Sequence, residues 1–480
     1  MNESNRKWYL LGFLALAQFM VVLDVSIMNV ALPSVQRSLH FSQEMLQWLV
    51  TAYTLSFGGF LLLGGRAADL YGRRRVFVGG VSAFALISLC VGLAQSDIQM
   101  IALRGLQGLA AAFMSPSALS IVLVTFRDHT ERTRALSIWG AVSAGGGAAG
   151  VLLGGLLTQY LSWRWNFFVN VPVAILVAYF ALRFAPPHES EETSKSLDLP
   201  GALLITSGLI LLVFALNDIA SKGWDSLPTL SLFALSACII VAFFFNESRA
   251  ARPLVPLSIF QIGNIAAADL TQLPITASLF SMFFFVSLYV QNVLGYSPIH
   301  SGLSFLPVPI LVGISATLAP RLIARIGYKP ILVGAPFLLM GGLFILAHVS
   351  VAGNYMSDVL PGLALMATGL GFCFVSLTVA ATSGVPGHYS GLASGLLSTA
   401  QQIGGAIGLA VLSAVATSTT AAYLASHTPS ASLRLEALVE GFHKAFYTGM
   451  LFALLASLFA LLFVRAIAPS KAGSPALDLG

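Results

Sequence analysis

The sequence predicts an all-α, polytopic membrane protein with fourteen transmembrane helices. Of its 480 residues, 57% are hydrophobic and only 9% are charged, and the mean hydropathy is +0.86. Soluble domains carry about 25% charged residues, so most of this surface cannot face water. The three cysteines, Cys90, Cys238 and Cys373, lie in apolar runs, which indicates small buried hydrophobic side chains rather than disulfides or a metal site.

The spans follow from stretches that lack Asp, Glu, Lys and Arg, because a helix needs about 20 apolar residues to cross a bilayer. Eight single spans are expected at 45–65, 76–96, 135–163, 165–182, 199–217, 226–246, 330–357 and 445–464. Residues 270–320 hold two more, divided by Gly295-Tyr296-Ser297-Pro298. Residues 359–433 hold another two, divided near Val385-Pro386-Gly387.

Two further spans each contain one charge, namely 8–32 with Asp24 and 98–126 with Arg104. Segment 8–32 is too long for the apolar region of a signal peptide, so we expect it to be retained and to end outside at Pro33. With the N-terminus in the cytoplasm, 18 of the 24 Lys and Arg residues fall on the cytoplasmic side and 5 on the outer side. This asymmetry predicts that both termini are cytoplasmic.

The loops exclude several function classes. The longest are about 185–198 and 418–443, so no soluble domain is expected. No Gly-Lys dipeptide occurs, so the sequence has no P-loop, and nothing favours binding of nucleotide or nucleic acid. The basic loop clusters are explained by topology and by contact with lipid headgroups. Uphill transport would therefore depend on an ion gradient.

A weak internal repeat indicates how the spans are organised. The segment from Gly65 to Arg74 ends the second span, and a shift of 255 residues aligns it with Pro320 to Lys329 at the end of the tenth. Transporters are commonly built from repeated helix bundles. We therefore expect a six-helix bundle at 1–184, a linker with two inserted helices at 185–262 and a second six-helix bundle at 263–480.

Asp24 is the one carboxylate deep in a predicted span, and burying such a group without a partner costs several kcal/mol. Arg104 is its natural partner. Asp24 lies nine residues before Pro33 and Arg104 seven residues after Asp97, so both lie about 10–14 Å below the outer surface. A carboxylate that is exposed first to one side and then to the other, with a partner that releases it on binding, is the minimum requirement for proton coupling. A salt bridge that only fixes helix packing is the alternative.

Neighbouring positions suggest a substrate cavity. Met20 and Met28 share the helical face of Asp24, and Gln107 shares the face of Arg104. One negative charge among Met, aromatic and amide side chains suits large, apolar, cationic ligands.

Glycines and one further acid suggest moving parts. Gly146, Gly150 and Gly154 recur every four residues and form a close-packing face, which serves either a static contact or a moving interface. Asp69, beside Arg73 at the end of the second span, could pair or cap a helix in one conformation only, as a latch.

The chain resembles the major facilitator superfamily, and in particular its fourteen-span drug:proton antiporters. The resemblance rests on the motifs Leu23 to Pro33, Gly65 to Arg75 and Arg104 to Gly108. It also rests on three stretches typical of the fourteen-span group, which are Trp163 to Pro172, Arg252 to Leu257 and Tyr289 to Pro298. One departure is Val151, where the antiporter motif of the fifth helix usually carries a proline after Gly150.

The resemblance implies export of amphipathic, cationic compounds across the cytoplasmic (inner) membrane in exchange for protons, with no other cofactor and no metal. It implies proton coupling by Asp24 and Arg104, and a monomeric protein. The resemblance also implies gating roles for Gly65, Asp69, Gly72 and Arg73, and substrate contact for Gln272 and Tyr289. Two alternatives stay open, namely export of an endogenous lipid, siderophore or metabolite, and a membrane-embedded enzyme or sensor.

Overall fold

The computed structural model describes residues 3–126, 128–185, 197–223, 226–250, 253–386, 389–428 and 432–466, which form long helices and no strand. Fourteen helical stretches within these ranges are long and apolar enough to cross a membrane, as the sequence predicts. The protein is therefore a multi-pass membrane protein. The start of the predicted linker, at 186–196, and Arg252 of one motif lie outside the described residues.

The first six spans are α1 (Glu3–Leu39), α3 (Trp48–Tyr71), α4 (Arg73–Gly92), α5 (Asp97–Thr125), α6 (His129–Tyr160) and α7 with α8 (Trp165–Phe168 and Asn170–Phe184). A single turn, α2 (Gln43–Leu46), precedes α3. The next two spans are α9 (Leu199–Lys222) and α10 (Leu227–Arg249).

The last six spans follow a short helix, η1 (Leu257–Gln261). They are α11 (Ile265–Leu288) with η2 (Tyr289–Val293), α12 with α13 (Pro298–Ser304 and Pro307–Ile326), α14 (Tyr328–Leu346), η3 with α15 (Tyr355–Val359 and Leu360–Thr382), α16 (Ser390–Ser426) and α17 (Leu433–Phe463). The break between α12 and α13 precedes Pro307, which has no N–H group to donate to a carbonyl of the preceding turn and is the first residue of α13.

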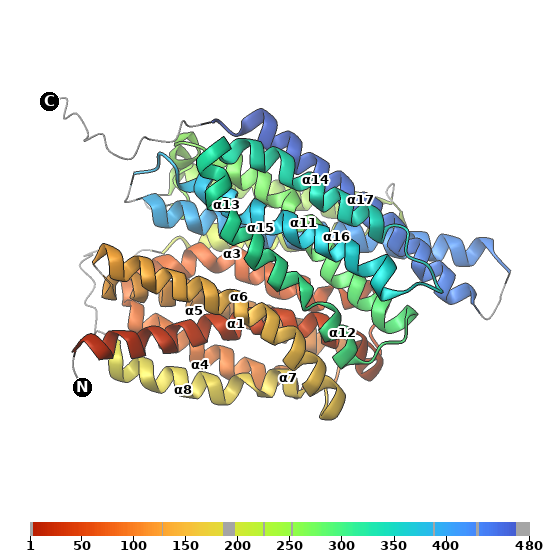
Figure 1. Ribbon diagram of the computed structural model, residues 1–480, viewed down its shortest axis with the longest axis horizontal. Helices are drawn as coiled ribbons and strands as arrows, with labels where there is room; N and C mark the ends of the chain where they lie inside the picture. The colour runs from red at the N-terminus through yellow and green to blue at the C-terminus, as the bar shows by residue number, and fades with distance from the viewer. Residues whose placement is uncertain are drawn as a thin grey trace.

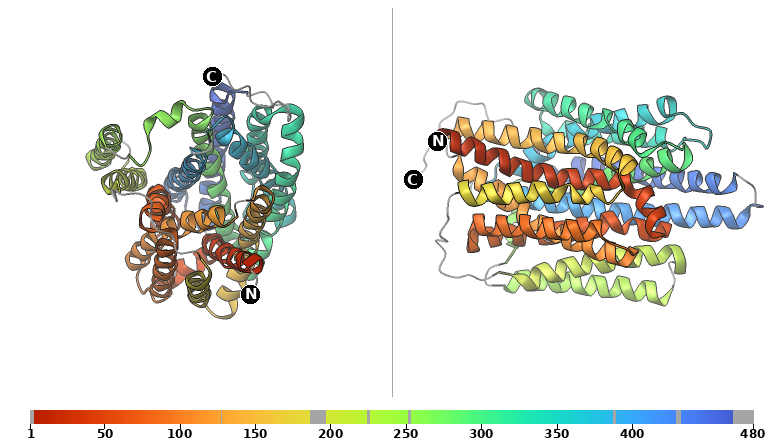
Figure 2. Two further views of the ribbon diagram at one scale, coloured as in Figure 1. Left: turned by 90° about the vertical axis from the view of Figure 1, so that its left-hand side faces the viewer. Right: turned by 90° about the horizontal axis from the view of Figure 1, so that it is seen from below.

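The described ends of the chain lie at the same end of the helix assembly, and the helices run along its long axis (Figure 1). Helices α1 to α8 pack mainly on one another, and so do α11 to α17. We call these groups the N-half and the C-half. The hairpin of α9 and α10 lies at the periphery, against α3 and α16 (Figure 2). Gln47, between α2 and α3, donates a hydrogen bond to Asn217 of α9, which fastens this hairpin to the N-half.

The first span does not end at Pro33 as expected, because α1 continues through it to Leu39. Proline has no N–H group, so the helical carbonyl four residues earlier, that of Asn29, loses its partner. Ser287 of α11 donates a hydrogen bond to that carbonyl at 2.6 Å, and Gln291 donates to the carbonyl of Val30 at 2.9 Å. The two halves are thus joined where α1 lacks a backbone donor.

A second junction lies at the same end of the molecule, where α12 packs against α6 (Figure 1). The backbone N–H of Ile299 donates to the side chain of Gln159 at 3.2 Å. Gly302 lies directly against the backbone carbonyl of Val151, which leaves no room for a side chain. We refer to the contacts of α1 with α11 and of α6 with α12 as the seal. It lies at the end of the assembly remote from the described chain ends.

The predicted repeat is visible in the backbone. Gly72, after α3, has φ 96°, and Gly327, after α13, has φ 80°. Both glycines therefore occupy the region that side chains disfavour, and each separates two long helices at a sharp turn. This match supports the alignment of the second and tenth spans.

The long outer loop expected at 418–443 is largely absent, because α16 continues to Ser426 and α17 begins at Leu433. The segment is rich in Ala and Leu, which favour helix in water as well as in lipid. Glu440 pairs with His443 and Lys444 one turn away, as expected of a helix that extends beyond the apolar span.

Candidate functional site at a buried ion pair

Asp24 of α1 and Arg104 of α5 form an ion pair inside the N-half. Nη1 of Arg104 lies 2.5 Å from Oδ2 of Asp24, and the side chains of Arg104 and Asp24 are 1% and 0% exposed. The pairing expected from their equal depth is therefore present. A buried pair of this kind avoids the cost of an isolated charge only when the remaining hydrogen-bonding atoms are also satisfied.

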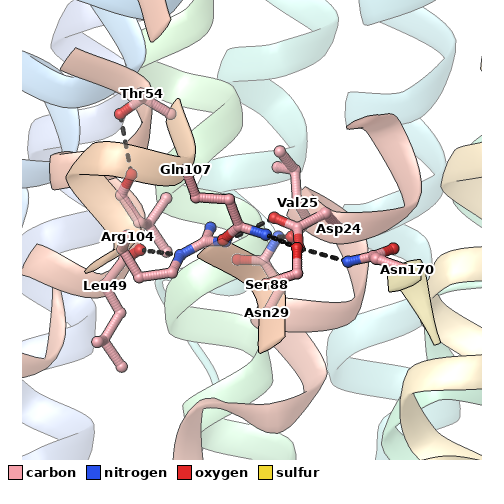
Figure 3. A network of polar contacts seen from close by, with 10 residues as sticks. Asp24, Val25, Asn29, Leu49, Thr54, Ser88, Arg104, Gln107 and Asn170 are labelled. Carbon is pink, nitrogen blue, oxygen red and sulfur yellow. Dashed lines mark hydrogen bonds and ion pairs between the residues drawn. The ribbon is translucent and has the colours of Figure 1, made fainter. Parts of the chain in front are cut away.

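Amide side chains supply those hydrogen bonds (Figure 3). Gln107 donates to Oδ1 of Asp24 at 2.9 Å, and Asn170 of α8 donates to the same atom at 3.2 Å. The Gln107 amide also donates to Ser88 of α4 at 2.8 Å, and its oxygen accepts from Arg104 at 2.6 Å. Helices α5 and α8 therefore hold the carboxylate directly, and Ser88 of α4 accepts a hydrogen bond from Gln107.

Helix α3 holds the arginine from the other side. Nε of Arg104 donates to the backbone carbonyl of Leu49 at 3.0 Å, and its guanidinium lies 4.4 Å from the centroid of the Tyr53 ring. A Cβ at Gly108 would overlap the backbone of Tyr53, so this glycine is what lets α3 approach α5 so closely. The arginine is consequently fixed by a carbonyl, a ring and two side chains.

The side chain in this site that can exchange a proton is the carboxylate of Asp24. Uptake of a proton there would leave Arg104 without its ionic partner. Arg104 keeps the carbonyl of Leu49 and the oxygen of Gln107 in either state. Protonation of Asp24 would therefore change the local charge by one, while these hydrogen bonds of Arg104 remain.

The glycine face of α6 packs against the part of α1 that carries Asp24. A Cβ at Gly150 would lie 2.6 Å from Cβ of Ser26 and 3.0 Å from the carbonyl oxygen of Leu23. At Gly146 and Gly154 it would meet the backbone of Phe19 and Ile27 at 3.1 and 3.0 Å. The glycines thus allow backbone contact with the residues on either side of Asp24.

Substitution Gly150→Ala is expected to destabilise the protein by about 1–3 kcal/mol, because the new methyl group overlaps Ser26. The measurement is the thermal unfolding temperature of the detergent-purified protein. Gly145→Ala is the matched control, since a Cβ there has nothing within 4 Å. Equal unfolding temperatures for the two variants would contradict a close-packing role for this glycine face.

The residues expected to line a substrate cavity are all buried in this structure. The exposed fraction is 1% for Met20, Met28 and Tyr289, 0% for Gln107 and 2% for Gln272. Gln107 belongs to the ion-pair network. Tyr289 donates a hydrogen bond to the carbonyl of Ser350 at 2.7 Å.

The expected latch lies at the end of the N-half near the chain ends. Asp69 accepts a hydrogen bond from Arg73 at 3.1 Å, one turn away. Gly72 provides the turn between the two residues, and Gly65 faces Pro116 of α5, which a Cβ would meet at 3.7 Å. Within the described contacts, the carboxylate of Asp69 thus pairs inside its own half.

Two members of the network, Asn170 and Ser88, were not expected from the sequence. Asn170 lies in the stretch Trp163 to Pro172, and an amide near the start of an apolar span is a signal that could have identified it. Ser88 gives no comparable signal, because a serine in a membrane helix commonly bonds to its own backbone.

Comparison with known proteins places the chain in a family. Its sequence matches the family model described as Major Facilitator Superfamily over residues 14–409. The chain belongs to the Major Facilitator Superfamily. It is therefore a transporter and not an enzyme. Like other members of the superfamily, this transporter handles small molecules within a membrane.

Similar proteins include resistance and export proteins from Streptomyces, Amycolatopsis and Mycobacterium. The chain is 38% identical to a puromycin resistance protein of Streptomyces alboniger, over 82% of this chain and 78% of that one. It is 40% identical to a cephamycin export protein of Amycolatopsis lactamdurans, over 77% and 76%. It is 36% identical to a multidrug resistance protein of Mycobacterium tuberculosis, over 79% and 70%.

Among solved structures, a bacterial homologue of the human lysosomal transporter Spinster aligns with a TM-score of 0.68 at 16% identity, covering 96% of this chain and 97% of that one. A POT family peptide transporter aligns with a TM-score of 0.67, also at 16% identity, covering 98% and 99%. At this identity the likeness extends to the fold alone.

Proposed function

We propose that this protein is a proton-coupled antiporter that exports amphipathic, cationic drugs or other toxic compounds across the cytoplasmic membrane. The coupling ion is the proton, and no further cofactor takes part. The observation that carries the proposal is the buried pair of Asp24 and Arg104, held by amides from two helices. Resistance and export proteins among the relatives support export as the direction and drugs as the substrates.

Alternating access supplies the mechanism. Residues 1–184 and 263–480 rock against each other, with 185–262 as the linker that carries the two inserted helices. The seal closes one side of the protein, and the excess of Lys and Arg on the opposite side supports cytoplasmic termini. In this proposal the protein works as a monomer, and the sealed arrangement is its cytoplasm-facing state, in which Asp24 is paired with Arg104.

Proton uptake from the outer side at Asp24 breaks that pair and favours return to the cytoplasm-facing state, where the proton is released. Each proton that moves down the membrane potential supplies about 2.3 kcal/mol per 100 mV. The glycine face of α6 and the pair of Asp69 with Arg73 are the contacts that rearrange during this cycle.

Asp24→Asn is expected to abolish coupling while the fold is retained, because Asn keeps the size and the oxygen of Asp but cannot carry the exchanged proton. The measurement is proton release from sealed inside-out vesicles with an acidic interior after a quaternary ammonium dye is added. Wild type should show dye-dependent release. Asp24→Asn should reduce it at least tenfold at matched expression, within the range for loss of a positioned proton-transfer group.

The matched control is Asp97→Asn, which changes a carboxylate in the first turn of α5, outside the network. Normal dye-dependent proton release in the Asp24→Asn variant would contradict the proposed coupling role. A wild-type protein without response to a broad panel of cationic and neutral compounds would contradict drug:proton antiport itself.

A further inference from the structure

Two carboxyl groups meet at one end of the inserted hairpin, apart from the site at Asp24. Asp198 lies directly before α9 and Glu247 lies near the end of α10, so both are at the end of the hairpin nearer to the described chain ends (Figure 2). Their exposed fractions are 9% and 3%. Two carboxyl groups buried together are costly while both are ionised, so their arrangement requires an explanation.

The contacts around Gly201 show that the two groups face each other. A Cβ on Gly201 would lie 2.7 Å from Oδ2 of Asp198 and 2.7 Å from Oε1 of Glu247, so both oxygens border the space that this glycine leaves. Oδ1 of Asp198 accepts a hydrogen bond from the backbone N–H of Gly201 at 2.9 Å, and Oε2 of Glu247 accepts one from that of Val255 at 3.0 Å. Asn246 donates to both oxygens of Asp198, at 3.0 and 2.9 Å.

One oxygen of this cluster, Oε1 of Glu247, has no hydrogen-bond partner. The group opposite it is the carboxyl of Asp198, which lies within hydrogen-bonding reach. Two carboxylates can only accept hydrogen bonds, whereas a carboxylic acid donates one to a carboxylate. A single proton between Oε1 of Glu247 and Oδ2 of Asp198 therefore pairs the unpartnered oxygen and removes one of the two negative charges.

The donor set of the cluster fits a proton and not a metal ion. A hard cation such as Ca²⁺ takes about six or more oxygen ligands. Here the carboxyl oxygens of Asp198 and Oε2 of Glu247 already accept hydrogen bonds from N–H groups.

Three other charged or titratable groups lie near this end of the hairpin, one on α3, one just before α16 and one on α10, and they are Arg66, Tyr389 and Arg249. Gly59 lies against Thr206, which sets the register that brings Arg66 level with residue 199. Arg66 and Tyr389 make other contacts, and Arg249 lies over an aromatic ring of its own helix. None of the described ion pairs joins a cation to either carboxyl group of the cluster.

The cluster also holds the connector, by which we mean residues 253–262 between α10 and α11. Glu247 binds it through the backbone N–H of Val255. Val255 in turn packs in one apolar cluster with Ala393 and Leu396 of α16 in the C-half. Loss of the shared proton leaves two carboxylates side by side, and rotation of Glu247 toward water relieves their repulsion and releases the N–H of Val255.

We infer that Asp198 and Glu247 form a second proton-binding site, and that the proton held there fastens the connector to the inserted hairpin. The site gives up this proton as the pH rises, and the connector is then released. In the proposed topology this end of the protein is cytoplasmic, so the pH of the cytoplasm controls the joint between the hairpin and the C-half. The inference does not depend on proton coupling at Asp24.

The first test detects the proton by infrared spectroscopy of the purified full-length protein, at pH values from about 5 to about 9, the range in which buried or paired carboxylic acids lose protons. Wild type should show a carbonyl signal of a protonated carboxylic acid that Glu247→Gln and Asp198→Asn both lack, because either amide donates to the remaining carboxylate. The signal should disappear as the pH rises. Glu440→Gln is the matched control and should retain it, since Glu440 already pairs with His443 and Lys444. A wild-type spectrum in this region equal to that of Glu247→Gln at every pH overturns the inference.

The second test measures release of the connector by thiol labelling of Val255→Cys, in a background without the three native cysteines. Val255 is 7% exposed, so labelling should be slow while the connector is fastened. The same cysteine substitution is combined with Glu247→Gln, whose amide keeps an acceptor for the backbone N–H and has no proton to lose in this pH range. The ratio of the two labelling rates cancels the pH dependence of the thiol itself.

This ratio, with Glu247 over with the glutamine, should be near one at low pH and should rise about tenfold at high pH. A ratio that stays constant as the pH changes overturns the proposed release of the connector. Neither readout involves transport, so a failure of drug:proton antiport would leave both results unchanged.

Discussion

Replacement of Arg104 by methionine is expected to destabilise the protein by about 3–5 kcal/mol, because it leaves the carboxylate of Asp24 buried without a counter-charge. Methionine has a comparable length and fills much of the same space, so the loss reflects charge and hydrogen bonds more than a cavity. The amides of Gln107 and Asn170 remain as donors to Asp24, but two neutral donors do not replace a guanidinium at 2.5 Å.

The effect of Asp24→Asn on stability should be smaller. Its asparagine retains an oxygen for Gln107 and Asn170, and Arg104 retains the carbonyl of Leu49, the oxygen of Gln107 and the ring of Tyr53. Removal of the Arg104 charge should therefore cost more stability than removal of the Asp24 charge, because Arg104 keeps more of its other contacts.

The measurement is thermal unfolding in detergent, monitored by size-exclusion chromatography after heating. The double variant Asp24→Asn with Arg104→Met removes both charges and should regain most of the stability lost in Arg104→Met. Arg325→Met, at an exposed position in the last turn of α13, is the control and should unfold like wild type. An Arg104→Met variant as stable as this control would show that the pair does not stabilise the N-half.

Gly302→Leu is expected to open the seal. The α-carbon of Gly302 lies against the backbone carbonyl of Val151, and a side chain at this position overlaps that carbonyl. Backbone cannot move aside as a flexible side chain can, so the overlap costs about 1–3 kcal/mol in the sealed conformation only. The equilibrium should therefore shift about tenfold toward conformations in which α12 and α6 separate.

The shift is measured through Ser287→Cys, an isosteric change at the seal, in a background without the three native cysteines. Ser287 is 0% exposed in the sealed state, so a membrane-impermeant thiol reagent added from outside should label it slowly. Gly302→Leu should accelerate labelling about tenfold and impair export. Gly313→Leu is the control, since a Cβ at that residue of α13 has nothing within 4 Å. Equal labelling rates in the two variants would contradict a sealing role for Gly302.

The seal also explains the position of Val151. The sequence carries valine where the antiporter motif usually has proline, and α6 is continuous through this residue. Val151 is 3% exposed, and its carbonyl provides the surface on which Gly302 rests. The two halves therefore meet here through backbone atoms, and α6 has no proline bend at this point.

The sequence by itself determined the number of spans, their approximate bounds and the buried pair. Charge-free runs of about 20 residues are a direct consequence of bilayer thickness, so they can be counted from the sequence. Asp24 and Arg104 could be matched because each was the one charge in its span and both lay at one depth. The signal was strong because a charge in an apolar span is costly and therefore rare.

Only the tertiary structure decided which polar groups complete that site and which do not. Gln107 was expected in a cavity and instead donates a hydrogen bond to Asp24. Asn170 and Ser88 complete the network from α8 and α4, and nothing in the sequence indicated that these helices contact the site. Pro33 was expected to end a helix. Instead α1 continues, and the Asn29 carbonyl left without a backbone donor accepts a hydrogen bond from Ser287 of the C-half. The physical reason is that the position of a span depends on the free energy of transferring its side chains into lipid, and this free energy is a sum over residues along the chain. Hydrogen-bond partners instead depend on the rotation and register of separate helices, which packing between them fixes.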